Sequence, residues 1–266
     1  MRLTRTAIVF FGLFALTTYA APHYQSSLNF LFWYNYGKTR GFSQIPAGGG
    51  PGTTSPRRPY LNQLGVDRTN IYNLMLAWHV NQFKLYGGYQ FDRQSGHSRV
   101  TQLTLTHATT FPAGANVRTR YNFDLARIGI AYFYPHATQR LIIYPAVEWT
   151  LLNFRSSLTS PGIRTQRDFD ASTVRFGSGF IYNFSHQLAF NMTAFTVIPN
   201  LTQLDVYTVA GRFMYLLAPQ TRSQPTIFLG MRWQRIRFQD HQRVPNYIKI
   251  TEWPLLEVGI KVKLIS

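Results

Sequence analysis

The sequence predicts an all-β fold, a single antiparallel up-and-down transmembrane β-barrel, on the strength of three observations. Ten segments alternate apolar and polar residues with a period of two, which is typical of strands with one apolar face. Of the 266 residues, 16% are aromatic and only 14% are charged, whereas roughly a quarter are charged in soluble proteins. After the first twenty residues, no run approaches the roughly 18 apolar residues of a membrane-spanning helix. Strands that turn their apolar face to lipid account for all three.

The N-terminus carries a predicted targeting segment. Arg2 and Arg5 precede a short apolar run, residues 7–16, and small residues follow it. This pattern predicts a secretory signal peptide over residues 1–20, so that the barrel comprises residues 21–266. An uncleaved anchor helix is the alternative, although the run is short for a bilayer.

The ten strands are predicted from alternation in each segment. The last is the most regular, because its even positions from Leu256 to Leu264 are all apolar. The fourth changes phase, which predicts a β-bulge near Ala126 and Arg127. Eight or twelve strands remain alternatives, since residues 100–110 could form another strand. The ten segments are 24–36, 69–80, 83–93, 116–134, 140–154, 171–184, 188–198, 204–217, 225–238 and 247–265.

Each strand has a set of apolar residues that is expected to face lipid. For the fourth strand, the set is taken from its first half, before the change of phase. In chain order, these sets contain Phe30 and Phe32, Leu74 and Leu76, Leu85 and Phe91, Tyr121 and Phe123, Val147 and Trp149, Val174 and Phe176, Phe190 and Met192, Val209 and Phe213, Leu229 and Met231, and Leu256 and Val258.

The connections alternate in length. Short links follow the even-numbered strands, and longer ones tend to follow the odd-numbered strands. Aromatic residues gather at both ends of the strands, as expected at two membrane interfaces. The short links are 81–82, 135–139, 185–187 and 218–224, and the long ones are 37–68, 94–115, 155–170, 199–203 and 239–246.

From Tyr24 to Ser266, these features resemble the architecture of Gram-negative outer-membrane β-barrel proteins, without matching one particular family of them. The resemblance implies a place in the bacterial outer membrane, contact with its lipid or lipopolysaccharide, and insertion by the barrel insertion machinery. Such proteins commonly end in an aromatic residue, whereas this chain ends in Ser266.

A net charge of +17 calls for an anionic partner. An exported chain meets little nucleic acid, so we expect no nucleic-acid partner. Phosphorylated lipid headgroups are the anionic surface that such a protein meets, and arginine pairs well with phosphate.

Charges on the polar faces are expected to point into the lumen. Glu148 should neighbour Arg175, and Glu257 should neighbour Arg232. The set forms either a constriction that favours anions or paired charges that fill a narrow barrel, and the second interpretation is preferred. The predicted charge network contains Asp124, Glu148, Arg175, Arg212, Arg232, Glu257 and Lys261, and Lys84, Asp92, Arg120 and Lys263 are also expected to face inward.

Arginines of the long-loop rim form a second group, which either contacts phosphate or is simply solvated. The candidates for anion or phosphate contact are Arg57, Arg58, Arg164, Arg167, Arg235 and Arg237.

No catalytic constellation is predicted. His79 has no serine or acid in phase beside it, His107 lies in the second long loop, and Asp240 and His241 are strand neighbours that face opposite ways. A nucleophile needs a base within hydrogen-bond reach, and none can be placed. The chain has no cysteine, which excludes thiolate metal sites, and no cofactor is expected. The sequence therefore predicts a structural barrel or a narrow, anion-leaning pore with a basic outer rim. A lipopolysaccharide-binding or adhesin-like barrel and a lipid-modifying enzyme are the alternatives.

Overall fold

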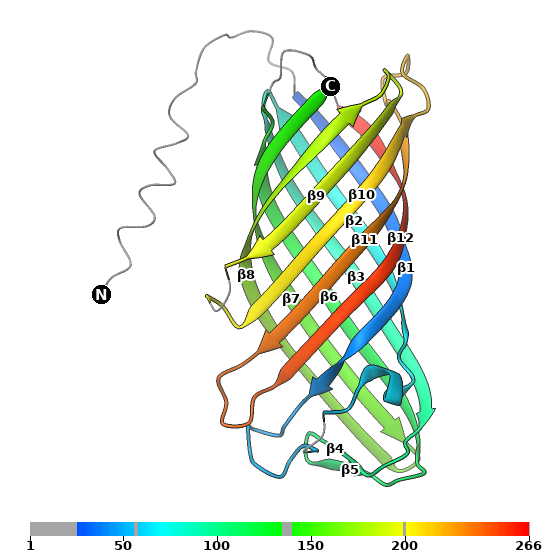
Figure 1. The fold of residues 1–266 in the computed structure, drawn as a ribbon, viewed down its shortest axis with the longest axis vertical. Coiled ribbons are helices and arrows are strands. Elements are labelled where there is room, and N and C mark those ends of the chain that lie inside the picture. The colour runs from blue at the N-terminus through cyan, green and yellow to red at the C-terminus, as the bar shows by residue number, and fades with distance from the viewer. Residues whose placement is uncertain (1–25, 56–57, 135–139, 199–200, 266) are drawn as a thin grey trace, which may run out of the picture.

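The computed structural model describes residues 26–55, 58–134, 140–198 and 201–265. The expected signal peptide, the expected link at 135–139 and Ser266 lie outside these residues. The described chain closes into an antiparallel barrel in the order β1-β12-β11-β10-β9-β8-β7-β6-β3-β2 (Figure 1). The prediction of ten barrel strands is thus confirmed. Their bounds are β1 Ser26–Gln44, β2 Arg68–Val80, β3 Phe83–Arg99, β6 Asn116–Tyr132, β7 Leu141–Ser160, β8 Ile163–Asn183, β9 Leu188–Val197, β10 Leu204–Leu216, β11 Thr226–Gln239 and β12 Tyr247–Ile265.

Three small elements lie in the loops at one end of the barrel (Figure 1). The 3-10 helix η1 (Leu61–Leu64) follows β1, and β4 (Thr104–Thr106) pairs with β5 (Thr109–Phe111) as a separate hairpin. Residues 100–110 therefore add no strand to the barrel. Among the described residues, no helix is long and apolar enough to cross a membrane.

Short turns close the other end of the barrel, where β12 also ends (Figure 1). Residues 81–82 join β2 to β3, and Asn81 adopts a φ of 53°, which asparagine tolerates in tight hairpins. Because outer-membrane barrels have short periplasmic turns and longer extracellular loops, we assign the turn end to the periplasm. The loops that carry η1 and the β4–β5 hairpin are then extracellular.

The long loop expected at 155–170 is not a loop, and this prediction is wrong. β7 and β8 continue as one hairpin whose pairing ends at Ser160 and Ile163. Gly162 supplies the positive φ of 72° that the turn requires. The segment looks like a loop in sequence because its outer face, with Arg164, Gln166 and Asp168, is exposed and polar.

Side chains alternate between an outward apolar belt and the lumen. Large apolar residues are exposed on the outer face, among them Leu76 at 50%, Leu229 at 65% and Leu256 at 57%. Their strand neighbours Ala77, Phe228 and Leu255 are buried. This inverted arrangement suits a hydrocarbon solvent, because apolar side chains on the outside are then in contact with lipid.

The bulge expected in the fourth strand is absent, so this prediction is also wrong. β6 pairs with both β3 and β7 without a register shift between Asn122 and Ala131. Tyr121, Phe123 and Leu125 are at most 1% exposed and lie inside the barrel. The apparent change of phase in the sequence is therefore a change of surroundings, from an apolar lumen to apolar lipid, along a regular strand.

This correction moves two charged residues from the lumen to the outer face. Asp124 alternates with Phe123 and Leu125, so it faces outward, as does Arg120. Asp124 pairs there with Arg93 at 2.8 Å, and the Arg93 side chain is 44% exposed.

A register shift occurs instead in β12. Pairing with both β1 and β11 shifts between Glu252 and Leu255, so the irregularity lies at Trp253-Pro254 of β12. Gly37 of β1 faces it, and a Cβ atom on Gly37 would lie 2.0 Å from the Pro254 carbonyl oxygen. The bulge changes the phase of β12, and both Glu252 and Glu257 consequently point inward.

Candidate functional site

An apolar plug fills the extracellular half of the lumen. Phe123 and Phe154 of the barrel wall are fully buried, and so are Leu61 of η1 and Phe111 of β5. Loop side chains thus share one core with the inner faces of the strands. The buried members of this plug are Ile45, Leu61, Leu64, Val66, Val100, Phe111, Val117, Tyr121, Phe123, Leu125, Leu152, Phe154, Leu158, Leu204, Val206, Ile236, Phe238, Ile248 and Ile250.

Aromatic rings connect the plug across the barrel. The Phe154 ring centroid lies 5.1 Å from that of Phe123 and 4.7 Å from that of Phe169. Phe169 in turn stacks on Phe238 at 4.2 Å. This chain of rings links β6, β7, β8 and β11, and the two spacings to Phe154 are typical of favourable aromatic pairs.

A charged layer lies next to the plug, and its first unit is Glu148 with Arg175. The Arg175 guanidinium pairs with Glu148, and its Nε donates to Oε1 at 3.0 Å. Arg175 Nη1 donates to Thr208 Oγ1, and Thr150 Oγ1 donates to Glu148 Oε1 at 2.9 Å. Both charged side chains are at most 2% exposed. The structure thus places these two residues side by side, as expected from the sequence.

The second unit pairs Glu257 with Arg212, and not with Arg232 as expected. Arg212 of β10 stands opposite Gly230, which in turn stands opposite Glu257 of β12. Because Gly230 has no side chain, Arg212 reaches across β11 and pairs with Glu257. Asn35 Nδ2 donates to the other carboxylate oxygen at 3.0 Å.

Arg232 belongs to a third unit made mainly of amides. Its Nη2 donates to Gln90 Oε1 at 2.9 Å and also bonds Gln234. Gln234 and Gln94 each donate to a Glu252 oxygen at 2.9 Å. Asp92 lies in the same unit, where it accepts from Thr69 Oγ1 at 2.6 Å. Side chains that are themselves hydrogen-bonded therefore fill the middle of the barrel.

On the periplasmic side of this charged layer, the lumen opens into an inner cavity of about 180 Å³. Aromatic side chains, including Trp33, Tyr144, Phe195 and Phe228, form much of its wall. Arg127 of β6 also lines it, and its Nη2 donates to Asn73 Oδ1 at 3.2 Å. We did not predict Arg127 in the charge network, because the bulge was expected at that residue.

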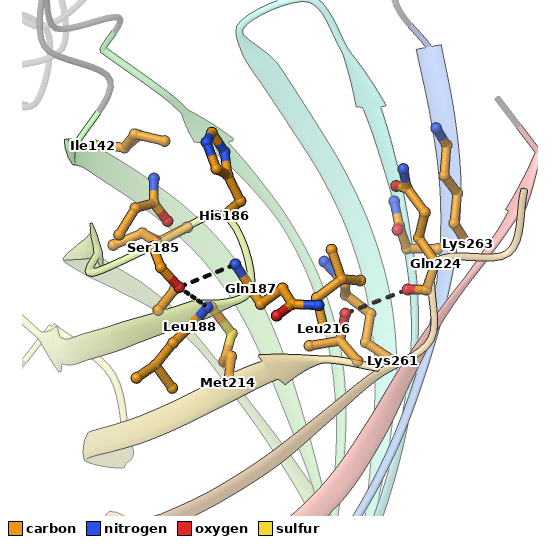
Figure 2. Close-up of a pocket in the computed structure, with 15 residues that line it drawn as sticks. Ile142, Ser185, His186, Gln187, Leu188, Met214, Leu216, Gln224, Lys261 and Lys263 are labelled. Atoms are coloured by element: carbon orange, nitrogen blue, oxygen red, sulfur yellow. Dashed lines mark hydrogen bonds between the residues drawn. The ribbon is translucent and has the colours of Figure 1, made fainter. Parts of the chain in front are cut away.

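A vestibule of about 260 Å³ lies beside the inner cavity, at the periplasmic end (Figure 2). Ser185 Oγ accepts from the backbone nitrogens of Gln187 and Leu188 at 3.2 and 3.0 Å, which fixes the β8–β9 turn. Figure 2 shows Lys261 and Lys263 of β12 across the vestibule from His186. Lys261 lines both spaces, so the vestibule adjoins the inner cavity.

A basic patch lies on the outer face near the extracellular rim. Thr251 of β12 stands between Arg40 of β1 and Arg235 of β11, and Lys249 stands opposite Arg237. Arg58 stacks over the rings of Phe42 and Tyr247, 5.0 and 4.6 Å from their centroids. In the described part of the chain, the one carboxylate paired with these residues is Asp205, 3.9 Å from Arg237. The basic patch comprises Arg40, Arg58, Arg235, Arg237 and Lys249.

The structure brings together only half of the predicted phosphate-contact set. Arg58, Arg235 and Arg237 belong to the basic patch. Arg164 and Arg167 lie on β8, three strands away from β11 in the barrel order. Arg167 also occupies an inward-facing position, like its in-phase neighbours Thr165 and Phe169. Arg57 lies outside the described residues.

The histidines do not form a catalytic site within the described residues. His79 stands in the inner cavity against the Phe133 ring, 5.6 Å away, and His107 faces the Pro46 carbonyl oxygen at 3.4 Å. No serine or carboxylate forms a hydrogen bond with His79, His107 or His241 in this part of the chain. Nor do the described residues contain three metal-ligating side chains close enough to share an ion.

An apolar outer belt, aromatic residues such as Trp78 and Trp253 on it, and a polar middle lumen define a transmembrane β-barrel of the bacterial outer-membrane type. Similar solved structures include the outer-membrane protease OmpT from Escherichia coli (TM-score 0.46, 11% identity, 89% of this chain and 97% of that chain). OprG from Pseudomonas aeruginosa has a TM-score of 0.40 at 11% identity, covering 92% and 98% of the two chains.

The attachment invasion locus protein Ail of Yersinia pestis, solved with the heparin analogue sucrose octasulfate, has a TM-score of 0.38 at 8% identity, covering 90% and 99%. At these identities the likeness concerns the fold alone. No protein family model matches the chain, and no curated protein matches its sequence.

Proposed function

We propose that the protein is a closed, non-conducting outer-membrane barrel. The observation that supports this proposal most is the apolar plug, in which Leu61 and Phe111 from the extracellular loops are fully buried among strand residues. An ion crossing this half of the lumen would lose its hydration without gaining polar partners, at a cost of many kcal/mol.

The charged layer supports the same conclusion. A selective constriction needs charges that remain free to meet permeating ions. Here Glu148, Arg175 and Glu257 are at most 2% exposed and are already paired or hydrogen-bonded. These pairings support filling of a narrow barrel over a narrow anion-leaning pore.

Single-channel recording in planar lipid bilayers tests this function. We expect the purified, folded protein to produce no conductance steps above the protein-free bilayer at either polarity. A general porin inserted under the same conditions serves as the control for detection. Reproducible steps with a reversal potential that favours anions would instead establish the narrow pore.

A second candidate function is supported by the basic patch. The exposed ring of Trp253 lies on β12, and the patch lies on its extracellular side. The paired positions of the patch on β12 and its two neighbouring strands are at least two residues from Trp253. The phosphates of the outer leaflet occupy this level of a membrane, and arginine binds phosphate through charge-assisted hydrogen bonds. We propose that the patch binds phosphate groups of lipopolysaccharide.

Replacing Arg235 and Arg237 together with serine is expected to weaken binding of lipopolysaccharide by about tenfold, because charge-assisted bonds are lost. The measurement is titration of detergent-solubilised protein with purified lipopolysaccharide. Arg164→Ser, which removes one arginine from β8, is the control and should leave the affinity within about twofold. Equal affinities for all three proteins would remove the patch as the binding site.

A further inference from the structure

The inner cavity carries more positive charge than the barrel itself neutralises. Six of its lining residues are lysine or arginine and one is acidic, Glu148. Glu148 pairs with Arg175, and Glu257, behind the wall, pairs with Arg212. Among the described residues, the other four have no carboxylate oxygen within 4.0 Å. These four are Lys84, Arg127, Arg232 and Lys261.

Several buried donors in the cavity wall also have no acceptor among the described residues. They are Nε of Arg127, Nε and Nη1 of Arg232, and the indole Nε1 of Trp33. Arg127 is 6% exposed, Arg232 is 1% and Trp33 is 2%, so the protein buries all three. A buried donor without an acceptor costs about 1–3 kcal/mol, and more when it is charged. An anion in the cavity would offset the excess positive charge, and a shift of these side chains toward it would give the donors an acceptor.

The remainder of the wall is apolar and aromatic. Trp33, Tyr144, Phe195 and Phe228 face the same space as the cations. Some of these rings already stack with cations, since Arg212 lies 5.4 Å from the Trp33 centroid and 5.5 Å from that of Phe228. Such a wall favours a flat ring beside the charged group of a ligand.

Volume limits the ligand further. A cavity of roughly 150 Å³ lined by apolar side chains accommodates benzene, and the inner cavity measures about 180 Å³. It therefore has room for one aromatic ring with its acid group. The apolar plug closes the extracellular side, whereas the vestibule leads to the periplasmic end.

We infer that the inner cavity is a binding site for a small aromatic oxyanion, a single ring that bears a carboxylate or a phosphate, admitted from the periplasm. The oxyanion lies among Lys84, Arg127 and Arg232, and the ring lies against the aromatic wall. This site is separate from the basic patch, which lies on the outer face, and it does not require conduction through the barrel.

Isothermal titration of the folded protein in a non-ionic detergent tests this inference with four probes. Benzoate and phenylphosphate represent the two acid groups, benzyl alcohol is a neutral ring of similar size, and inorganic phosphate lacks the ring. We expect at least one aromatic anion to bind at least about tenfold more tightly than both benzyl alcohol and inorganic phosphate, because each comparison removes one set of contacts. No heat from any probe, or equal affinity for benzoate, phenylphosphate and benzyl alcohol, would overturn the inference.

Variants locate the site. Lys84→Gln and Arg127→Gln should each weaken binding of the preferred anion by about five- to tenfold. Lys38→Gln, which removes the same charge from the outer face and lies outside the basic patch, should leave it unchanged. Heat-modifiable migration in gels and circular dichroism establish that each variant is folded. The bound anion should quench tryptophan fluorescence. Loss of this quenching in Trp33→Phe would place the ring of the ligand against the aromatic wall. Unchanged affinity in both lumen variants would exclude the cavity.

Discussion

Glu148→Ala is expected to destabilise the barrel by about 3–5 kcal/mol, because it leaves a buried arginine without its counter-charge. Arg175 is 1% exposed and, among the described residues, keeps only Thr208 Oγ1 as a hydrogen-bond acceptor once the carboxylate is removed. Urea unfolding in lipid vesicles, followed by tryptophan fluorescence, measures the loss. Glu148→Gln retains an acceptor for Arg175 and should cost less.

Two comparisons separate charge burial from simple loss of contacts. The double variant with Glu148→Leu and Arg175→Met removes both charges and should recover most of the stability, since apolar pairs often replace buried ion pairs without loss. Asp124→Ala breaks the ion pair on the outer face, where Arg93 is 44% exposed. That change should cost less than about 1 kcal/mol. Equal costs for Asp124→Ala and Glu148→Ala would contradict the assignment of the two residues to opposite faces.

Most of the fold could be predicted from the sequence because lipid imposes one apolar face on every strand. In β7, the alternation of Val147, Glu148 and Trp149 is enough to direct the carboxylate inward, and the structure has that phase. The inward direction of Arg175 follows from the same rule in β8, where Val174 faces outward. Their proximity follows because the two strands are consecutive and form one hairpin.

The errors arise where the lumen is not polar. Period-two alternation tells which residues share a face, but it does not tell which apolar face meets lipid when the barrel also has an apolar core. Tyr121 and Phe123 look like lipid-facing residues in the sequence, yet they belong to the plug. The resulting change of phase suggested a bulge in β6, whereas the register shift lies at Pro254 in β12. Proline in a strand was the available signal for it.

Partners that lie two strands apart could not be predicted at all. Arg212 meets Glu257 only because Gly230 leaves space between them. Similarly, the loop residues of η1 carry no sequence signal that they enter the barrel. These features depend on closure of the whole sheet and on side-chain volumes in its interior, which local patterns do not encode.

Phe154→Ala is expected to destabilise the protein by about 3–5 kcal/mol, the usual cost of removing a buried phenylalanine ring. Phe154 is fully buried and touches the rings of Phe123 and Phe169, so its loss leaves a void between three strands. The same void should loosen Leu61 and Leu64, which pack in the same core. Faster amide exchange in η1, together with a lower urea midpoint, would record both effects.

A matched truncation in the neighbouring loop distinguishes the plug from general fragility. Leu103 is 62% exposed, and Leu103→Ala should change stability by no more than about 0.5 kcal/mol. If Phe154→Ala were as mild as Leu103→Ala, the extracellular half of the lumen would not be a packed core. The barrier to ions would then rest on the charged layer alone, where Arg212 is already 19% exposed. Stability of Phe154→Ala and conductance of the unaltered barrel therefore probe one physical feature, the packing of loop residues among inward-facing rings.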